Sequence, residues 1–316
     1  MTDALLARIG NTPLVELGRL SPRPGVRLFA KLEGLNPSGS VKDRVALALV
    51  EEAERAGKLR PGMTIVEASS GNTGIALTMV ARRKGYDVRI VLPKEVAPSI
   101  GDALGLYGAD CIWCPRCVGM DDAIRRAHEL SEKHGWYPLG QFEQAANMQA
   151  HYRTTGVELL AQLDRIDVFV AGIGTGGTVM GVGKRLRERN PDVQIIGIEP
   201  KLGDKLQGLR SLAEGFRPPL LDLDALDGRM ARLLKASSDF GAELDSLSDF
   251  VSFGVSPAFI MYYWSLQNLG GIGWAVALFY AVCMGLRLAM AMSIWAVSRR
   301  GPDRVTGTSN RVKLPD

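Results

Sequence analysis

Charged side chains are nearly absent from one long stretch of this 316-residue chain. Although the sequence holds 38 Lys and Arg and 34 Asp and Glu residues, only Arg287 falls between Phe250 and Ser298. A stretch of this length and polarity is typical of a membrane-spanning segment. Residues 250–266 and 272–297 are therefore predicted to form two transmembrane helices, with core helices of a soluble fold as the alternative.

An export signal and clusters of basic residues are also lacking. The first ten residues, MTDALLARIG, contain neither a charged segment followed by an apolar core nor an Arg-rich amphipathic pattern, so we expect synthesis in the cytoplasm. The net charge is +4 and the basic residues are spread along the chain, which argues against a nucleic-acid partner. Arg299, Arg300 and Arg304 follow the apolar stretch and favour a cytoplasmic location for the basic tail, residues 299–316.

Cysteine is scarce, with four residues in the chain. Cys111, Cys114 and Cys117 are spaced C-x2-C-x2-C, which could indicate zinc or an iron–sulfur cluster. No His flanks them, and the fourth residue, Cys283, lies in the apolar stretch. Reduced thiols on a strand at 111–114 and in the following loop are the preferred interpretation.

Residues 1–222 alternate short β-branched runs with longer amphipathic stretches. The predicted strands are 64–67, 88–92, 168–171 and 195–198. Strands separated by helix-length segments indicate βαβ units and a mostly parallel sheet, hence an α/β fold. Ligands of such sheets bind at the carboxyl ends of the strands, so the loops there are the candidate sites.

The first unusual loop contains an amine that could react with an aldehyde. Ser38 or Ser40 can cap a helix that continues to about Ala56, which places Lys42 in its first turn. The positive end of the helix dipole favours the neutral amine there, and a neutral amine is the better nucleophile. An ordinary exposed lysine is the alternative.

Two further loops each follow a strand and begin a helix. The loop 67–74 presents hydroxyls, an amide and backbone N–H groups that suit a carboxylate, whereas a simple polar turn is the alternative. The loop 172–178 is rich in glycine and suits a phosphate at a helix N-terminus. Gly172, Gly174 and Gly177, with Glu199 on the next strand, also fit a dinucleotide-binding pattern.

Together these loops resemble the cysteine synthase family, O-acetylserine sulfhydrylases of the pyridoxal-phosphate fold type II class, whose fold is like that of the tryptophan synthase β chain. Other matching motifs are Ile9-Gly-Asn-Thr-Pro-Leu14, Gln141-Phe142 and Gly197-Ile-Glu-Pro200. About seven-tenths of the chain takes part in the resemblance. The dinucleotide interpretation therefore becomes the second one.

The resemblance implies a role for each loop in β-replacement on O-acetylserine, with sulfide or thiosulfate as the sulfur donor. Lys42 would bind pyridoxal 5′-phosphate covalently and act as the catalytic base, and Asn72 would bind the ring hydroxyl. The phosphate would be bound by Gly174, Thr175, Gly176, Gly177 and Thr178. The substrate carboxylate would be bound by Ser69, Ser70, Thr73 and Gln141. The resemblance leaves open whether the chain is a homodimer.

Family members continue with a final segment that returns to the larger domain and contributes a Ser to the cofactor. Nothing after Gly228 has that pattern here, so the α/β domain is predicted to be truncated at its C-terminus. Loss of the segment would remove packing as well as a cofactor contact. Weak cofactor binding and impaired activity are therefore expected.

Four aspartates after residue 222 form a second constellation. Asp224 and Asp227, and then Asp245 and Asp249, are spaced so that each pair would project from one face of a helix. Four converging carboxylates could bind divalent cations that hold a pyrophosphate. A solvated acidic helical hairpin is the alternative.

This constellation resembles that of CDP-alcohol phosphatidyltransferases, and the text from Phe240 to Pro257 is similar to phosphatidylserine synthase. By resemblance the four aspartates would bind Mg²⁺ or Mn²⁺, and Asp249 would also be a catalytic base toward serine. The chain is thus predicted to join a pyridoxal-phosphate domain (1–222) to a membrane fragment (223–298) and the basic tail. Membrane lipid is expected to contact residues 250–298, which places this segment in the cytoplasmic membrane.

Overall fold

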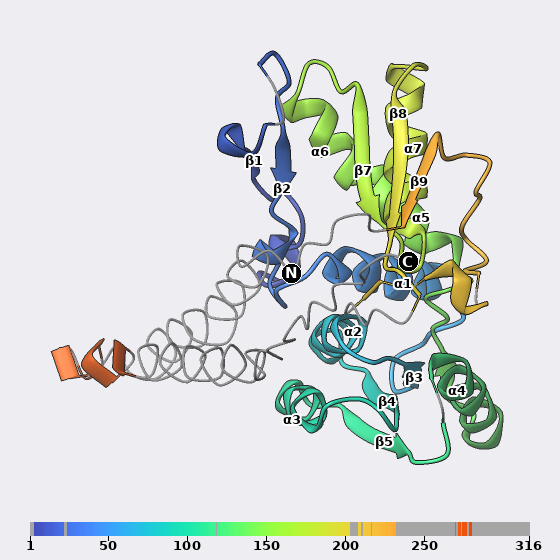
Figure 1. Ribbon diagram of the computed structural model, residues 1–316. Helices are drawn as coiled ribbons and strands as arrows, with labels where there is room; N and C mark the ends of the chain where they lie inside the picture. The colour runs from blue at the N-terminus through green and yellow to red at the C-terminus, as the bar shows by residue number, and fades with distance from the viewer. Residues whose placement is uncertain are drawn as a thin grey trace, which may run out of the picture. The chain divides into compact units, whose positions relative to one another are not determined.

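The computed structural model describes residues 3–231 apart from 22–23, 118, 203–207, 210 and 216, together with 269, 271–272, 274–276 and 278–279. Contacts divide the chain into two compact units, Met1–Leu233 and Leu234–Asp316. The first unit contains every strand of the described residues (Figure 1).

A parallel sheet forms the first half of this unit. Its strands follow the order β5-β4-β3-β6, with bounds β3 (Thr64–Ala68), β4 (Asp87–Pro93), β5 (Asp110–Cys114) and β6 (Tyr137–Pro138). Its helices are α1 (Lys42–Arg55), α2 (Asn72–Arg83), α3 (Pro98–Tyr107) and α4 (Met120–His134). Neighbouring strands pair in parallel, which confirms the predicted βαβ units.

Both faces of this sheet are buried. Successive side chains of a strand point to opposite faces, so neighbouring residues reach different cores. Ile65 packs into a core with α1, α2 and α3, whereas Val66 packs into a second core with α4. A parallel sheet covered on both faces explains why consecutive apolar residues occur in these strands, as in Ile65-Val66 and Ile90-Val91-Leu92.

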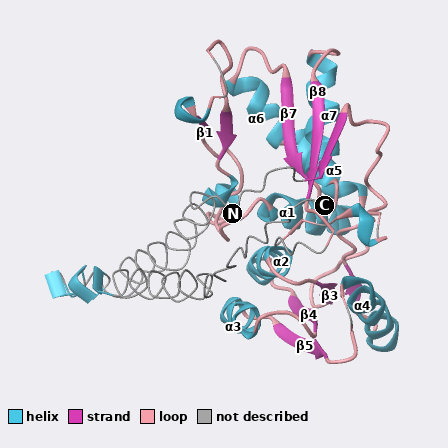
Figure 2. Cartoon of the chain, viewed as in Figure 1, coloured by secondary structure: helices cyan, strands magenta, loops and turns pink. Residues whose placement is uncertain are grey.

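A second parallel sheet follows, in the order β7-β8-β9. Its strands are β7 (Val168–Gly172), β8 (Gln194–Glu199) and β9 (Gly228–Ala231). The helices around it are α5 (Ala145–Arg153), α6 (Thr155–Gln162) and α7 (Gly177–Arg189). Figure 2 shows the three strands side by side with α6 and α7 behind them, and a core that includes Phe169, Ile195 and Leu186 fills that face. A separate antiparallel pair joins β1 (Leu14–Glu16) to β2 (Phe29–Lys31).

The opposite face of β7 is open. Val168 and Val170 retain 47% and 53% of their accessible surface, while the alternate residue Phe169 joins the core. Among the described strands, β7 pairs with β8 alone, so it is an edge strand.

The predicted state of two cysteines is wrong. Cys111 to Cys114 is a strand as expected and Cys111 is a free thiol, but Cys114 forms a disulfide with Cys117. The N–H of Cys117 donates to the carbonyl of Cys114 at 3.0 Å, and this tight turn brings the two side chains together. No group of three or more potential metal ligands occurs among the described residues.

The predicted helix carrying Asp224 and Asp227 is also wrong. These residues lie in the turn between Leu221 and β9, and β9 extends the sheet through its pairing with β8. The Asp227 carboxylate accepts the N–H of Ile195 at 2.7 Å and pairs with Arg187 at 2.7 Å. Sheet pairing and this ion pair therefore override the local i,i+3 pattern.

Asp245, Asp249 and most of 250–298 lie outside the described residues, so the predictions made for them remain predictions. No helix in the described part of the chain is long and apolar enough to cross a bilayer. The described residues from 271 to 279 are helical, and Ile272 and Phe279 are largely exposed.

Candidate active site

Lys42 is the first residue of α1, as predicted. The Ser40 hydroxyl accepts the backbone N–H of Lys42 at 3.3 Å, and the backbone N–H of Ser38 donates to the Asp43 carboxylate at 2.7 Å, so both serines shape this turn. The side chain is half-buried, and burial lowers the pKa of its amine. The direction agrees with the sequence argument, although burial rather than the helix dipole is the cause. A neutral amine in this position can attack a carbonyl carbon.

A buried ion-pair network fixes the turn before Lys42. The guanidinium of Arg44 pairs with Glu33 at 2.7 Å and with Glu158 at 2.5 Å, and Lys31 pairs with Glu158 at 2.7 Å. Burial opposes ionisation of Glu158, but hydrogen bonds from Arg44 and Lys31 outweigh it and lower its pKa to about 2. Charges this well paired lock α1 in place, because breaking one buried pair would leave another charge unpaired.

The loop after β3 carries the residues predicted to bind a carboxylate. The Ser69 hydroxyl accepts the N–H of Gly74 at 2.8 Å, which caps the first turn of α2. The Thr73 hydroxyl donates to the Gln141 side chain at 2.7 Å, so two residues 68 positions apart in the sequence meet here. Ser70 and Asn72 are exposed beside them.

The glycine loop lies between the carboxyl end of β7 and the start of α7. Gly176 has a φ of +85°, a conformation that L side chains rarely adopt, and α7 begins at Gly177. A Cβ on Gly174 would lie 2.3 Å from the carbonyl oxygen of Gly208, so a side chain cannot be accommodated there. A glycine turn that opens a 13-residue helix is well suited to an anionic group such as a phosphate.

Helix α5 connects the two loops through residues that the sequence argument missed. The Asn147 amide donates to the Gln141 carbonyl at 2.8 Å and to the Thr175 hydroxyl at 2.9 Å. One turn later, His151 Nε2 lies 3.1 Å from the Thr178 hydroxyl. The i,i+4 spacing of two polar residues was the available signal, but it does not indicate which helix they face.

His151 is neutral in this position. Burial, and then the positive charge of Lys42, lower the pKa of His151 to about 3. Its two ring nitrogens lie within hydrogen-bond distance of the hydroxyls of Thr155 and Thr178, so the neutral ring can accept one bond and donate the other. His151 therefore orients Thr178 without adding a charge.

These residues suit a phosphorylated aldehyde cofactor. The half-buried amine of Lys42 suits the aldehyde. Its pKa is lowered, and the amine makes no hydrogen bond or ion pair within the described part of the chain. The glycine turn at α7 suits the phosphate, and the Thr73–Gln141 pair lies just after β3 and β6 of the first sheet. Hydrogen bonds through Asn147 join these two loops into one site.

A dinucleotide fits the glycine loop less well. The dinucleotide pattern requires Glu199 to offer its carboxylate to a ribose. In the structure, Glu199 is buried and its carboxylate accepts the backbone N–H of Leu212 at 2.6 Å. The side chain is thus used within the fold.

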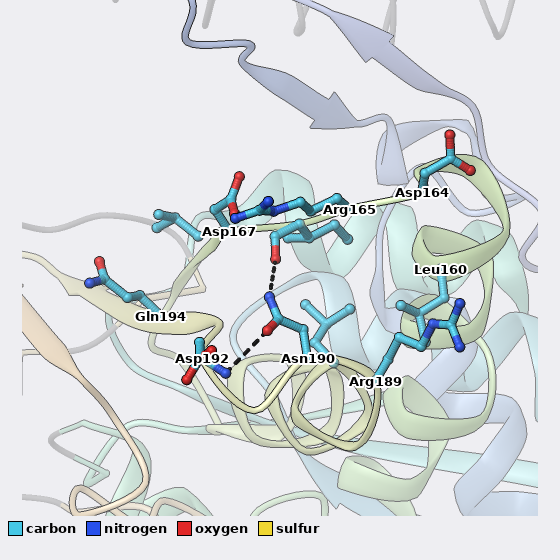
Figure 3. A pocket seen from close by; sticks show the side chains of 11 residues that line it. Leu160, Asp164, Arg165, Asp167, Arg189, Asn190, Asp192 and Gln194 are labelled. Carbon is cyan, nitrogen blue, oxygen red and sulfur yellow. Dashed lines mark hydrogen bonds and ion pairs between the residues drawn. The ribbon is translucent and has the colours of Figure 1, made fainter.

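A cavity of about 610 Å³ lies elsewhere, between the amino ends of β7 and β8 and the last turns of α6 and α7 (Figure 3). Asn190 donates to the carbonyl of Ile166 at 3.1 Å, and Arg165 pairs with Asp167 at 2.6 Å. Because the glycine loop follows the carboxyl end of β7, this cavity is not part of the candidate site.

Comparison with known proteins shows the family of this chain. A family model for pyridoxal-phosphate dependent enzymes matches residues 5–242. The chain belongs to this family. Cysteine synthase from Staphylococcus aureus (strain N315) is 41% identical over 251 residues, which cover 77% of this chain and 80% of the relative.

Two further proteins are similar to this chain. Cysteine synthase B from Salmonella typhimurium (strain LT2) is 42% identical over 226 residues, covering 71% of this chain and 75% of that protein. The crystal structure of an O-ureido-L-serine synthase matches with a TM-score of 0.69 and 38% identity, covering 74% of this chain and 77% of that one. The type II α/β fold, the enzyme class and the cofactor, pyridoxal phosphate, are thereby established for this family member.

A second family model, for CDP-alcohol phosphatidyltransferases, matches residues 220–315. The two matches overlap from 220 to 242, which includes Asp224, Asp227 and β9. In the described part of this overlap, Asp227 and β9 complete the second sheet of the pyridoxal-phosphate fold.

Proposed function

We propose that the chain catalyses β-replacement on O-acetylserine, with acetate as the leaving group and sulfide or thiosulfate as the incoming sulfur donor. The observation that carries this proposal is the hydrogen-bonded path Thr73–Gln141–Asn147–Thr175, which joins a carboxylate-binding loop to a phosphate-binding loop. The cysteine synthase relatives support the substrate class.

Each loop has a role in this proposal. The amine of Lys42 binds the cofactor aldehyde and then removes the α-proton of the substrate, for which its lowered pKa suits it. Pyridoxal 5′-phosphate, when bound, supplies the electron sink that makes this proton removable. Asn72 binds the ring hydroxyl, and residues 174–178 bind the phosphate.

The substrate carboxylate binds to the loop after β3. The donors we assign to the carboxylate are the exposed Ser70 and Thr73, whose hydroxyl hydrogen turns from Gln141 to the substrate. Ser69 stabilises the loop instead, because its hydroxyl accepts the N–H of Gly74. The substrate is thereby oriented with its α-proton toward Lys42.

Substitution of Lys42 tests this function. The full chain mixed with pyridoxal 5′-phosphate is expected to absorb in the visible beyond the absorbance of the free cofactor, and Lys42→Ala should abolish this excess. Lys58→Ala is the matched control, because Lys58 is an exposed lysine near the C-terminal end of the same helix. Equal absorbance of the Lys42→Ala and wild-type proteins would contradict the proposed role of the amine.

A second candidate function is a metal-dependent phosphatidyl transfer from CDP-diacylglycerol to serine. The family match over 220–315 and the exposed apolar helical residues Ile272 and Phe279 favour it. Asp224, Asp227, Asp245 and Asp249 would bind Mg²⁺ or Mn²⁺, at the expense of the Arg187–Asp227 ion pair. Metal-dependent release of CMP, lost in Asp245→Ala, tests this candidate.

The domain organisation belongs to the same proposal. We assign residues 1–222 to the pyridoxal-phosphate domain in the cytoplasm, 223–298 to a fragment bound to the cytoplasmic membrane, and 299–316 to a basic tail. The start of the second segment still belongs to the sheet of the first, because β9 pairs with β8. The replaced C-terminal part leaves the cofactor without its final family contact, so we expect weak cofactor affinity. A tight stoichiometric complex would contradict that expectation.

A further inference from the structure

Asn147 occupies the point where the two loops of the candidate site meet. Its side chain is fully buried, with an exposed fraction of 0%. Its amide nitrogen carries two hydrogens, and each is used on a different loop. One bond reaches the Gln141 carbonyl at 2.8 Å and the other reaches the Thr175 hydroxyl at 2.9 Å.

The amide oxygen of Asn147 faces the start of α7. It has no hydrogen-bond partner among the described residues, and a Cβ on Gly177 would lie 2.0 Å from it. A buried amide oxygen without a partner is costly, so its retention needs a reason. We infer that Asn147 is retained for its amide nitrogen, because an apolar residue could not replace the two hydrogen bonds that this nitrogen donates.

We propose that Asn147 is a positioning residue that sets the distance between the substrate-binding loop and the phosphate-binding loop. Through the Gln141 carbonyl it holds the residue whose side chain meets Thr73, and through the Thr175 hydroxyl it fixes the glycine turn before α7. The inference rests on the proposed function, because it concerns the same cofactor site.

This role predicts a specific pattern of binding. The position of Thr175 matters for the phosphate but not for the reaction of Lys42 with the aldehyde. Loss of Asn147 should therefore weaken the binding of pyridoxal 5′-phosphate more than that of pyridoxal, which lacks the phosphate. A merely structural role would weaken both equally or lower the melting temperature alone.

The experiment compares the affinities of the full chain for the two aldehydes by visible absorbance, in wild type, Asn147→Ala and Asn147→Asp. The preference for the phosphorylated aldehyde is expected to fall at least about tenfold in Asn147→Ala. It should fall further in Asn147→Asp, which loses both donors and adds a negative charge near the phosphate site. The concentration of O-acetylserine that produces half of the spectral change should also rise, because Asn147 no longer holds Gln141 in place.

Asn190→Ala is the matched control. The Asn190 amide donates to the Ile166 carbonyl at 3.1 Å beside the cavity away from the site, so this variant should keep the wild-type preference. Should Asn147→Ala not fold, Asn147→Ser tests the same role, because its shorter side chain cannot reach both partners, and it should lose the same preference.

The outcomes separate the two proposals. A wild-type chain that binds neither aldehyde through Lys42 would overturn the proposed function itself. A wild-type chain that prefers pyridoxal 5′-phosphate, together with folded Asn147 variants that keep this preference, would overturn the role of Asn147 alone.

Discussion

Glu67 carries a carboxyl group buried near the end of β3, at the start of the loop 67–74 that is predicted to bind substrate. Burial raises its pKa to about 7, although backbone N–H groups of Gly140, Gln141 and Ala68 partly offset the effect. The hydrogen bond from Gly140 is 2.8 Å long and ties the loop that carries Gln141 to β3. Sequence alone predicted the polar character of residues 67–74 but could not show that Glu67 points into the fold.

The stability of the domain should therefore depend on the protonation of Glu67. Because the folded-state pKa of about 7 lies above the ordinary value of 4.5, the stabilisation is complete below about pH 4.5 and is lost as the pH rises through 7. Glu67→Gln removes this dependence. The free energy of unfolding of the variant, relative to that of the wild-type chain, should therefore rise by up to about 3 kcal/mol from pH 5 to pH 8.

Urea unfolding followed by circular dichroism at the two pH values measures this gain. Glu143→Gln controls for the loss of one negative charge, since Glu143 is exposed nearby. An equal difference between Glu67→Gln and wild type at pH 5 and pH 8 would contradict burial as the cause.

At the scale of elements, helix α5 packs against both α1 and α7 and so connects the halves of the site. Close approach to α7 depends on small residues, because a Cβ on Gly181 would lie 2.2 Å from the carbonyl oxygen of Met148. The sequence predicted that a helix follows β7, since the apolar run ends in a glycine turn. It did not predict that α5 lies against that helix, because such pairing depends on contacts distant in the sequence.

Gly181→Ala is therefore expected to destabilise the domain by roughly 2 kcal/mol or more, through overpacking against backbone that cannot move aside. Gly105→Ala in α3 is the contrasting variant, because a Cβ on Gly105 would point into open space. That change should stabilise by about 0.5–1 kcal/mol, as alanine favours a helix over glycine. Thermal melts of both variants test the contrast, and a neutral Gly181→Ala would show that α5 and α7 are further apart.

Prediction at this scale was best where periodicity and turn residues agree. The predicted strands 64–67, 88–92, 168–171 and 195–198 all exist, with ends within two residues. The prediction failed at Asp224 and Asp227, where an i,i+3 pattern suggested a helix. There the pairing of β9 with β8 decides the structure, and single-sequence spacing contains no information about that pairing.

At the scale of the whole molecule, part of the second sheet is exposed among the residues that the structure describes. The relatives are matched over 75–80% of their length, and the match to the pyridoxal-phosphate family ends at residue 242. On the structure, Val168 and Val170 of β7 are about half exposed on the face opposite α6 and α7. An exposed apolar edge strand promotes pairing with other chains.

Val170→Lys is expected to reduce aggregation of the chain while changing the free energy of unfolding by no more than about 0.5 kcal/mol. Light scattering during warming measures the aggregation. Val157→Lys is the matched control, because Val157 is an exposed valine on α6 rather than on a strand edge. If Val170→Lys unfolds the protein instead, this face of β7 is covered in solution.

The central claim is that the amine of Lys42 forms the covalent bond to the cofactor aldehyde. The most direct measurement is reduction of the full chain with borohydride in the presence of pyridoxal 5′-phosphate, followed by digestion and mass spectrometry of the peptides. The account predicts a phosphopyridoxyl group on the peptide that contains Lys42. A modification found on exposed lysines such as Lys58, with the Lys42 peptide unmodified, would contradict it.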